Sequence, residues 1–379
     1  MEPIYLDNAA TTRPLPSVID AISHQLDLCF GNPSSPHGFA DAPRRALNDA
    51  REFLRGTVSA AKLIFTSGGT EADLLGVAGA ARCRPPGRVL VGAADHPAVL
   101  AQERLLGSSH RIVPVPVTDT GVIEPQTLFE LLGKDVRVVS LLHGHNELGS
   151  LTQIKELTEI VRRVAPNAHI HVDLVQAYGK IPFDLDEADA DSVAVSGHKF
   201  HGPRGAGFLA LSSKARLDPL QEGGGQEFGM RGGTENVAGA VGVAIAAEAA
   251  MTHMAETAAH TSHLGQSLFS RLEEAFPKAT RLGDANHRLP HILSLRLPGI
   301  VAGTLQERCS HRGLAFSTGS ACHDPQASEN HVLRAIGLER RASREVLRLS
   351  FSHLTTQEEA EQAAEIIIDE AEKLTRVSI

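Results

Sequence analysis

The chain has 379 residues, of which 42% are hydrophobic, and it contains 34 glycines and 20 prolines. This is the composition of a globular enzyme of two or three domains, and it excludes a disordered or fibrous chain. A formal net charge of −9 at pH 7 and an isoelectric point of about 6.1 argue against a nucleic-acid partner.

The cysteines and the amino-terminal segment indicate where the protein works. Cys29, Cys83, Cys309 and Cys322 are too scattered for a disulfide framework or a Cys-x-x-Cys metal site, so we expect a reducing cytoplasm. Residues 1–12 lack a charged segment followed by an apolar core, and no stretch approaches ~18 uninterrupted apolar residues. We therefore expect neither a signal peptide nor a membrane partner.

The first chemically informative segment is a glycine-rich turn at Ser67–Glu71. In chain order we expect an irregular start (1–16), a helix (17–28), a turn-rich loop (31–38), a helix (40–54), a strand (62–66) and a helix that ends near Ala81. A turn such as Ser-Gly-Gly-Thr-Glu between a strand and a helix presents free backbone N–H groups to an anion such as a phosphate. It is not a GxxxxGK[ST] loop, so nucleotide triphosphates are not implied, and an ordinary turn is the alternative.

Histidines follow two of the next predicted strands. His96 comes after a strand at 89–91, where it is either a structural side chain or part of a site. His143 and His145 come after a strand at 136–142. A metal would need a third ligand at a matching spacing, which the sequence does not supply, so we predict no metal site.

A carboxylate and a lysine follow two further strands. Asp173 ends a strand at 169–173, where it could face a site or cap the next helix. Lys199 follows the short apolar run 193–195. The alternative interpretation is that its side chain simply extends from the strand end into solvent. Repeated strand–helix units predict a mainly parallel sheet with helices on both faces, whose strand ends are where ligands bind. A poorly solvated amine there would have a lowered pKa.

After Leu211 the pattern changes, which indicates a second domain. We expect glycine-rich segments at 223–227 and 231–235, a helical stretch at 236–276, strands at 292–297 and 346–351, a small-residue loop at 317–325 and a last helix at 356–374. We predict an amino-terminal arm (1–14) packing with the small domain, a large cofactor-binding domain (15–255) and a small α+β domain (256–379) that carries the Cys322 loop.

Four of these features together match the needs of pyridoxal 5'-phosphate. The turn at Gly69 and Thr70 would bind the phosphate, and Lys199 would hold the aldehyde as an imine. Asp173 would keep the ring nitrogen protonated, and His96 could lie against the ring. Each feature is weak alone, but in this order they are specific for this cofactor.

The sequence resembles the cysteine desulfurase and selenocysteine lyase family of class V aminotransferases, which are fold-type I pyridoxal-phosphate enzymes. The matching stretches span nearly the whole chain: YLDNAATT (5–12), GNPSSPH (31–37), FTSGGTEA (65–72), DHPAVL (95–100), HVDLVQAYGK (171–180), SGHKFHGPRG (196–205), GGGQE (223–227), RGGTEN (231–236), STGSAC (317–322) and LRLS (347–350). The resemblance implies an α/β large domain with a mainly parallel sheet and a smaller α+β domain.

The resemblance also implies roles for single residues. Lys199 would be the Schiff-base lysine and would move the substrate α-proton, with His96 stacking on the ring and handling protons. The remaining cofactor ligands would be Gly69, Thr70, Asp173 at the pyridine nitrogen, Gln176 at the ring hydroxyl, Ser196, His198, and Thr234 from the other subunit of a homodimer.

For the substrate, the resemblance implies that Arg348 binds the α-carboxylate of L-cysteine, assisted by Asn146. The Cys322 thiolate would attack the substrate sulfur, giving L-alanine and a Cys322 persulfide for a sulfur-acceptor protein. The alternative for Cys322 alone is an inert small hydrophobic residue.

Three segments depart from the family pattern. The usual Asn-Asn-Glu-Thr appears as His145-Asn146-Glu147-Leu148, the Arg after Gly-Gly-Gln-Glu is Phe228, and the usual Gly-Arg is Ser352-His353. His145 and Phe228 could alter the substrate pocket or a contact to the sulfur acceptor. The Cys322-His323 dipeptide resembles the corresponding sequence of selenocysteine lyases, so L-selenocysteine is the alternative substrate. A catalytically idle iron–sulfur assembly scaffold is the alternative from another class, and the intact Lys199, Asp173 and Cys322 argue against it.

Overall fold

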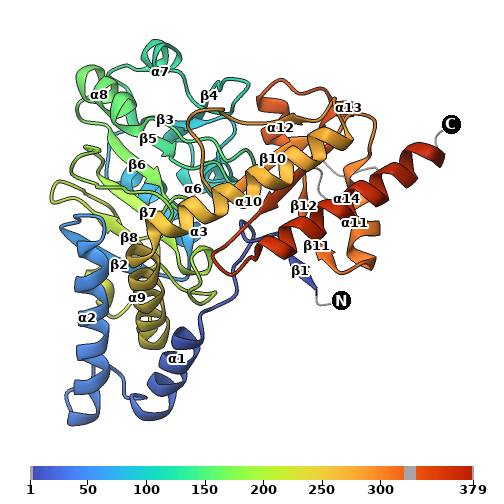
Figure 1. Ribbon diagram of the computed structural model, residues 1–379. Coiled ribbons are helices and arrows are strands. Elements are labelled where there is room, and N and C mark those ends of the chain that lie inside the picture. Colours follow the sequence, from blue (N-terminus) through green and yellow to red (C-terminus); the bar gives the residue numbers. More distant parts are fainter. Residues whose placement is uncertain (1–2, 320–329, 378–379) are drawn as a thin grey trace.

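A seven-stranded sheet forms the centre of the larger part of the molecule (Figure 1). The computed structural model describes residues 3–319 and 330–377. The strands are β2 (Lys62–Thr66), β3 (Gly87–Gly92), β4 (His110–Val115), β5 (Val136–Leu142), β6 (His169–Asp173), β7 (Ser192–Ser196) and β8 (Gly207–Leu211), in the order β2-β8-β7-β6-β5-β3-β4. Only β8 runs antiparallel to its neighbours, so the predicted mainly parallel sheet is confirmed.

Helices cover both faces of this sheet, as apolar strands buried on both sides require. One face packs against α1 (Pro16–Leu28), α2 (Asp41–Gly56), α7 (Pro125–Leu131), α8 (Ile154–Val164) and α9 (Val237–Thr252). The other packs against α3 (Gly69–Leu74), a π-helical turn (Leu75–Gly79), α4 (Ala80–Arg82), α5 (Pro97–Leu100) and α6 (Glu103–Leu106). All five residues of β6 and of β7 are buried between these layers, so only the strand ends can reach a ligand.

A second, four-stranded sheet forms the smaller part of the molecule. Its order is β12 (Ser317–Thr318), β13 (Val346–Ser350), β10 (Ile292–Arg296) and β9 (Thr280–Arg281), all antiparallel. Its own apolar cluster includes residues of α10 (Met254–Ala275), α11 (Ala302–His311) and α14 (Gln357–Val377); α12 (His331–Ala335) and α13 (Arg340–Ser343) complete this part. The smaller α+β unit is the one expected from the sequence.

The amino-terminal segment contributes to this smaller unit. Strand β1 (Ile4–Tyr5) pairs in parallel with β11 (Leu314–Ala315), and the side chains of Ile4 and Leu6 belong to the same apolar cluster. The chain reaches the smaller unit before it enters the large sheet. The exact domain boundaries after residues 14 and 255 stay predictions.

The helical stretch predicted at 236–276 is broken at His253 into α9 and α10, which are bent by 74°. Figure 1 shows α10 running from the large sheet toward the small one. Within residues 3–319 and 330–377, no single helix is long and apolar enough to cross a membrane, although α9 and α10 pass such a test as a bent pair.

Candidate active site at the carboxyl ends of β6 and β7

Lys199 lies just beyond the carboxyl end of β7, in the 3-10 turn η3 (Gly197–Lys199). Its Nζ donates hydrogen bonds to the carbonyl oxygens of Ala9 (2.7 Å) and Ala10 (2.9 Å). The buried Lys180 Nζ donates to the backbone carbonyl of Lys199 itself, at 2.6 Å. The amine is therefore held at the strand end, rather than extended into solvent.

The surroundings of Lys199 favour its neutral amine. Burial, together with the charge of Arg348, lowers the pKa of Lys199 to about 8, against the opposing effects of Asp173 and Asp7. An amine with this pKa is substantially neutral near pH 8 and can act as a nucleophile or a base.

We predict that this shift is visible in the pH dependence of Lys199 acetylation. In cofactor-free protein, the rate of reaction with acetic anhydride should rise with pH and level off above about 8, because only the neutral amine reacts. For an unperturbed lysine, with a pKa of about 10.4, the acetylation rate would keep rising with pH. Mass spectrometry of the Lys199 peptide measures the rate, and exposed lysines in the same digest serve as the control. A Lys199 profile that still climbs above pH 9.5 would contradict the shift.

Asp173 ends β6, the parallel neighbour of β7, which places it beside Lys199 at the same sheet edge. Its side chain is buried, and Oδ1 accepts a hydrogen bond from the Val175 N–H at 2.9 Å. Burial, reinforced by Asp73, raises the pKa of Asp173 to about 8. A carboxyl group in such surroundings is stabilised as the anion only when a cationic partner is bound next to it.

Behind Asp173 lies a buried polar network that the sequence analysis missed. His171 Nε2 is 3.1 Å from Asp73 Oδ1, and Ser192 Oγ is 2.8 Å from both His171 Nδ1 and His169 Nε2. Burial raises the pKa of Asp73 and lowers the pKa of both histidines. The available signal was the alternation 169-171-173, which puts three polar side chains on one face of a buried strand.

The glycine-rich turn lies against the same strand ends. Gly68 has a φ of +149°, and a Cβ added to it would lie 3.6 Å from Ser196 Oγ. A Cβ added to Gly69 would come within 2.7 Å of Val175 Cγ2, so glycine is required there. Thr70 follows in the first turn of α3 and is exposed. The Ser67 N–H donates to Glu71 Oε2 at 2.6 Å, and Gly68 to Thr70 with Ser196 form one cradle at the start of the helix, where backbone N–H groups can face an anion.

His198 and Gln176 tie the amino-terminal segment to this cradle. His198 Nδ1 is 3.1 Å from Thr11 Oγ1, and Gln176 Nε2 donates to the Ala9 carbonyl at 2.8 Å. Burial, with Lys199 as the second cause, lowers the pKa of His198 to about 4. His198 therefore enters the site as a neutral ring.

His96 is the N-cap of α5, and its Nδ1 accepts a hydrogen bond from the Ala98 N–H at 3.1 Å. Burial, followed by the charges of Lys199 and His331, lowers its pKa. In the neutral ring Nε2 then carries the proton. His96 therefore presents an N–H donor, and taking up a proton requires breaking the cap.

Arg348, in β13 of the small sheet, faces the same region. Its guanidinium donates to Asp7 Oδ1 (2.7 Å), Ser317 Oγ (3.0 Å) and the Asn146 carbonyl (3.0 Å). Its Nε is buried without a hydrogen-bond partner in the described part of the chain. A cavity of about 100 Å³ opens beside it, lined also by Glu147. An unsatisfied guanidinium N–H at a cavity is suited to a carboxylate ligand.

Residues 4–363 match the family described as aminotransferase class-V. The chain belongs to this family. The curated cysteine desulfurase NifS of Azotobacter vinelandii is 34% identical over 369 residues, which cover 96% of this chain and 91% of that protein. A solved "NifS-like protein" is 32% identical, with a TM-score of 0.91 over 97% of this chain and 98% of that chain. SspA, solved in complex with cysteine, is 26% identical, with a TM-score of 0.80 over 93% and 100% of the two chains.

The strand-end residues of this class-V chain fit pyridoxal phosphate. The glycine-rich turn, in which a Cβ on Gly68 would lie 3.6 Å from Ser196 Oγ, suits a phosphate, and the buried Asp173 suits a cationic ring nitrogen. Lys199, with its lowered pKa, suits an aldehyde. Gln176 and His198 border the same space through the 9–11 segment. These residues come from elements up to 130 positions apart, and the fold brings them together.

Two predicted residues are not part of this assembly in one chain. Thr234 is exposed on the 231–236 loop, whose start is tied to α3 by an ion pair between Arg231 and Glu71 (3.0 Å). Cys322 lies outside the described residues. Their roles stay predictions.

Two of the family departures lie away from Lys199 in this class-V chain. His145 is buried, with Nε2 3.1 Å from the Ala94 carbonyl and Nδ1 accepting from the Glu147 N–H, and burial lowers its pKa to about 4. The His145 side chain thus fixes the backbone turn that leads into Glu147. Phe228 is 58% exposed, with the Lys62 ammonium 4.4 Å from its ring centroid. The charge of Arg348 also contributes to the lowered pKa of His145.

Proposed function

We propose that this protein is a pyridoxal-phosphate-dependent cysteine desulfurase, which converts L-cysteine to L-alanine and keeps the sulfur as a persulfide on Cys322. The observation that carries the proposal is the meeting of Lys199, the buried Asp173 and the partly unsatisfied Arg348 around one space. The cysteine desulfurase name of a full-length relative and the cysteine bound to SspA support the substrate class.

The chain's own residues supply binding and proton transfer. Arg348 binds the substrate carboxylate, and its hydrogen bond to Asp7 must weaken when it does so. The neutral Lys199 amine takes the α-proton, and Asp173 pairs with the ring nitrogen. The bound cofactor supplies an electron sink for the carbon that loses the proton.

The sulfur step requires a nucleophile. The Cys322 thiolate forms a bond to the substrate sulfur while the carbon–sulfur bond breaks, and the electron pair stays on the carbon that becomes the methyl group of alanine after protonation. The persulfide is then passed to a sulfur-acceptor protein.

L-Selenocysteine is the second candidate substrate, because the sequence carries Cys322-His323. Release of alanine and of sulfide or selenide, measured with both substrates side by side, decides between them. A protein without turnover of either substrate would instead agree with the scaffold alternative.

Asp173→Asn is expected to reduce alanine release from L-cysteine by orders of magnitude and to leave the fold intact. Asparagine is similar in shape but carries no charge, so it cannot keep a ring nitrogen protonated. Steady-state kinetics measures the loss, and thermal unfolding of the variant is the control. Kinetics equal to wild type would show that Asp173 does not face the ring.

A homodimer is proposed because Thr234 lies exposed on a loop that resembles one reaching a neighbour's phosphate. Sedimentation at low concentration, with activity measured on the same samples, should show a dimer whose activity falls when it dissociates. A fully active monomer would refute this arrangement.

A further inference from the structure

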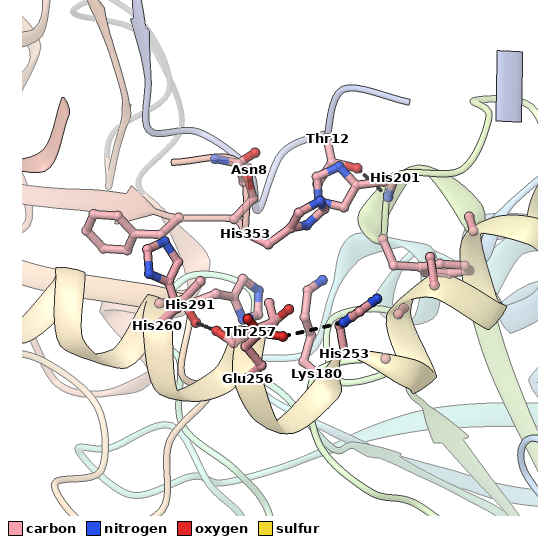
Figure 2. A pocket seen from close by; sticks show the side chains of 18 of the residues that line it. Asn8, Thr12, Lys180, His201, His253, Glu256, Thr257, His260, His291 and His353 are labelled. Carbon is pink, nitrogen blue, oxygen red and sulfur yellow. Dashed lines mark hydrogen bonds and ion pairs between the residues drawn. The ribbon is translucent and has the colours of Figure 1, made fainter. Parts of the chain in front are cut away.

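A second and larger cavity, of about 620 Å³, lies between α9, α10 and the segment after β13 (Figure 2). Its lining residues come from 8–15, 179–180, 200–201, 246–261, 291 and 351–353. None of them is a predicted cofactor or substrate ligand. We refer to this space as the histidine cavity, because His201, His253, His260, His291 and His353 all line it.

Basic groups dominate the polar lining. Besides the five histidines, the cavity is lined by Lys180, which is 8% exposed. Figure 2 shows His201 and His353 side by side, and their ring centroids are 4.5 Å apart. Among the described residues of the lining, Glu256 is the only acid; its side chain is 83% exposed and pairs with His253 at 3.4 Å. The ionisable side chains of the lining are therefore mainly basic.

His201 and His260 bond to the backbone carbonyls of Arg13 and Thr355, but the buried His291 and Lys180 keep unused hydrogen-bonding capacity. His291 is 2% exposed and its Nδ1 has no hydrogen-bond partner among the described residues, while Nε2 is 3.5 Å from Gln176 Oε1. Lys180 donates to the Lys199 carbonyl, which uses one of its three N–H donors. An anion in the cavity would stabilise the protonated forms of Lys180 and His291 and turn the free Nδ1 into a donor.

Burial already disfavours those protonated forms. It lowers the pKa of Lys180 to about 7, with Lys199 as the second cause, and the pKa of His201 to about 4. Burial therefore disfavours a further cation in the cavity, whereas an anion would pair with the protonated side chains and offset part of that cost. A divalent metal is not indicated either, because no group of three or more His, Cys, Asp or Glu side chains in residues 3–319 and 330–377 could hold one.

Apart from the neutral polar side chains of Asn8, Thr12, Thr257, Thr261 and Ser352, the rest of the lining is an apolar wall. It consists of Leu15, Phe200, Ala246, Ala249, Ala250 and Phe351. Phe200 and Phe351 are almost fully buried, so this wall is part of a packed scaffold. A mostly apolar pocket with a few convergent polar groups is the usual form of a small-molecule site.

We propose that the histidine cavity binds a small organic carboxylate with an apolar body. The carboxylate pairs with the Lys180 and His291 end, and the apolar body packs against Ala249 and the two phenylalanines. This site is separate from the one that holds the amino-acid substrate, because Arg348 is not part of it.

Isothermal titration calorimetry on the full-length protein tests the proposal, with 2-naphthoate as the probe. Its neutral isostere 2-naphthamide should bind at least tenfold more weakly, and inorganic phosphate should not displace the naphthoate. Equal binding of the amide would overturn the charge requirement. Displacement by phosphate would overturn the carboxylate class.

Three variants locate the binding. Ala249→Phe fills the cavity from a helical position and should weaken 2-naphthoate binding at least tenfold, whereas Arg348→Gln should leave it unchanged. The reverse pattern would place the probe in the substrate site and overturn the proposal. His291→Phe keeps a ring but removes the nitrogen that would donate to the carboxylate, and it should weaken binding several-fold. It serves in place of Ala249→Phe if thermal unfolding shows that variant to be misfolded, and unchanged binding in it would then overturn the proposal.

Discussion

Lys199→Ala is expected to lower alanine release from L-cysteine by roughly 10²–10⁴-fold or more, the range that a positioned general base contributes. The purified variant should also lose the visible absorbance of a cofactor bound covalently to the protein. The reason is geometric. Lys199 is the lysine whose Nζ is held at the end of β7 by the carbonyls of Ala9 and Ala10, with a pKa lowered to about 8.

The control is Lys155→Ala, which removes an exposed lysine from α8. It should keep wild-type kinetics and absorbance. Thermal unfolding of both variants separates lost chemistry from lost structure. Normal turnover in folded Lys199→Ala would show that another amine does the chemistry, and the assignment of Lys199 would then be wrong.

The sequence predicted the strand-end part of this site because the relevant signals are local. A short buried run that ends in a polar residue marks both β6 with Asp173 and β7 with Lys199. Parallel strands bring such ends to one edge of the sheet. The turn at Gly69 could also be predicted from the sequence, because a glycine-rich turn before a helix is a local pattern.

Contacts between distant residues could not be predicted in the same way. The pairing of His171 with Asp73 joins residues 98 positions apart, and that of Arg348 with Asp7 joins residues 341 apart. The break at His253 was hidden because helix-forming residues continue on both sides. The histidine cavity lies where this bend sets α9 and α10 at an angle, beside the segment after β13.

The antiparallel strand β8 was also missed. Gly207–Leu211 has the same apolar character as the parallel strands, and periodicity carries no information about direction. Its position between β2 and β7 matters for the site, because Ser196 pairs with Gly207 and β8 thereby fixes the end of the Lys199 strand.

The second large effect is expected at Cys322. Cys322→Ala should abolish persulfide formation and reduce alanine release from L-cysteine to near background, while cofactor absorbance is retained. Sulfur leaves carbon poorly, so a nucleophile is needed to accept it. Selenium leaves more readily, and the variant should therefore keep part of its activity on L-selenocysteine.

The matched control is Cys83→Ala, which removes an exposed cysteine whose pKa is raised by partial burial and which therefore has less thiolate. It should keep wild-type turnover. Alanine release is measured with both substrates, and mass spectrometry of the Cys322 peptide detects the extra sulfur. Full activity of Cys322→Ala on L-cysteine would refute the persulfide mechanism, because the strand-end residues would then suffice to split the substrate as a simple pyridoxal-phosphate lyase does.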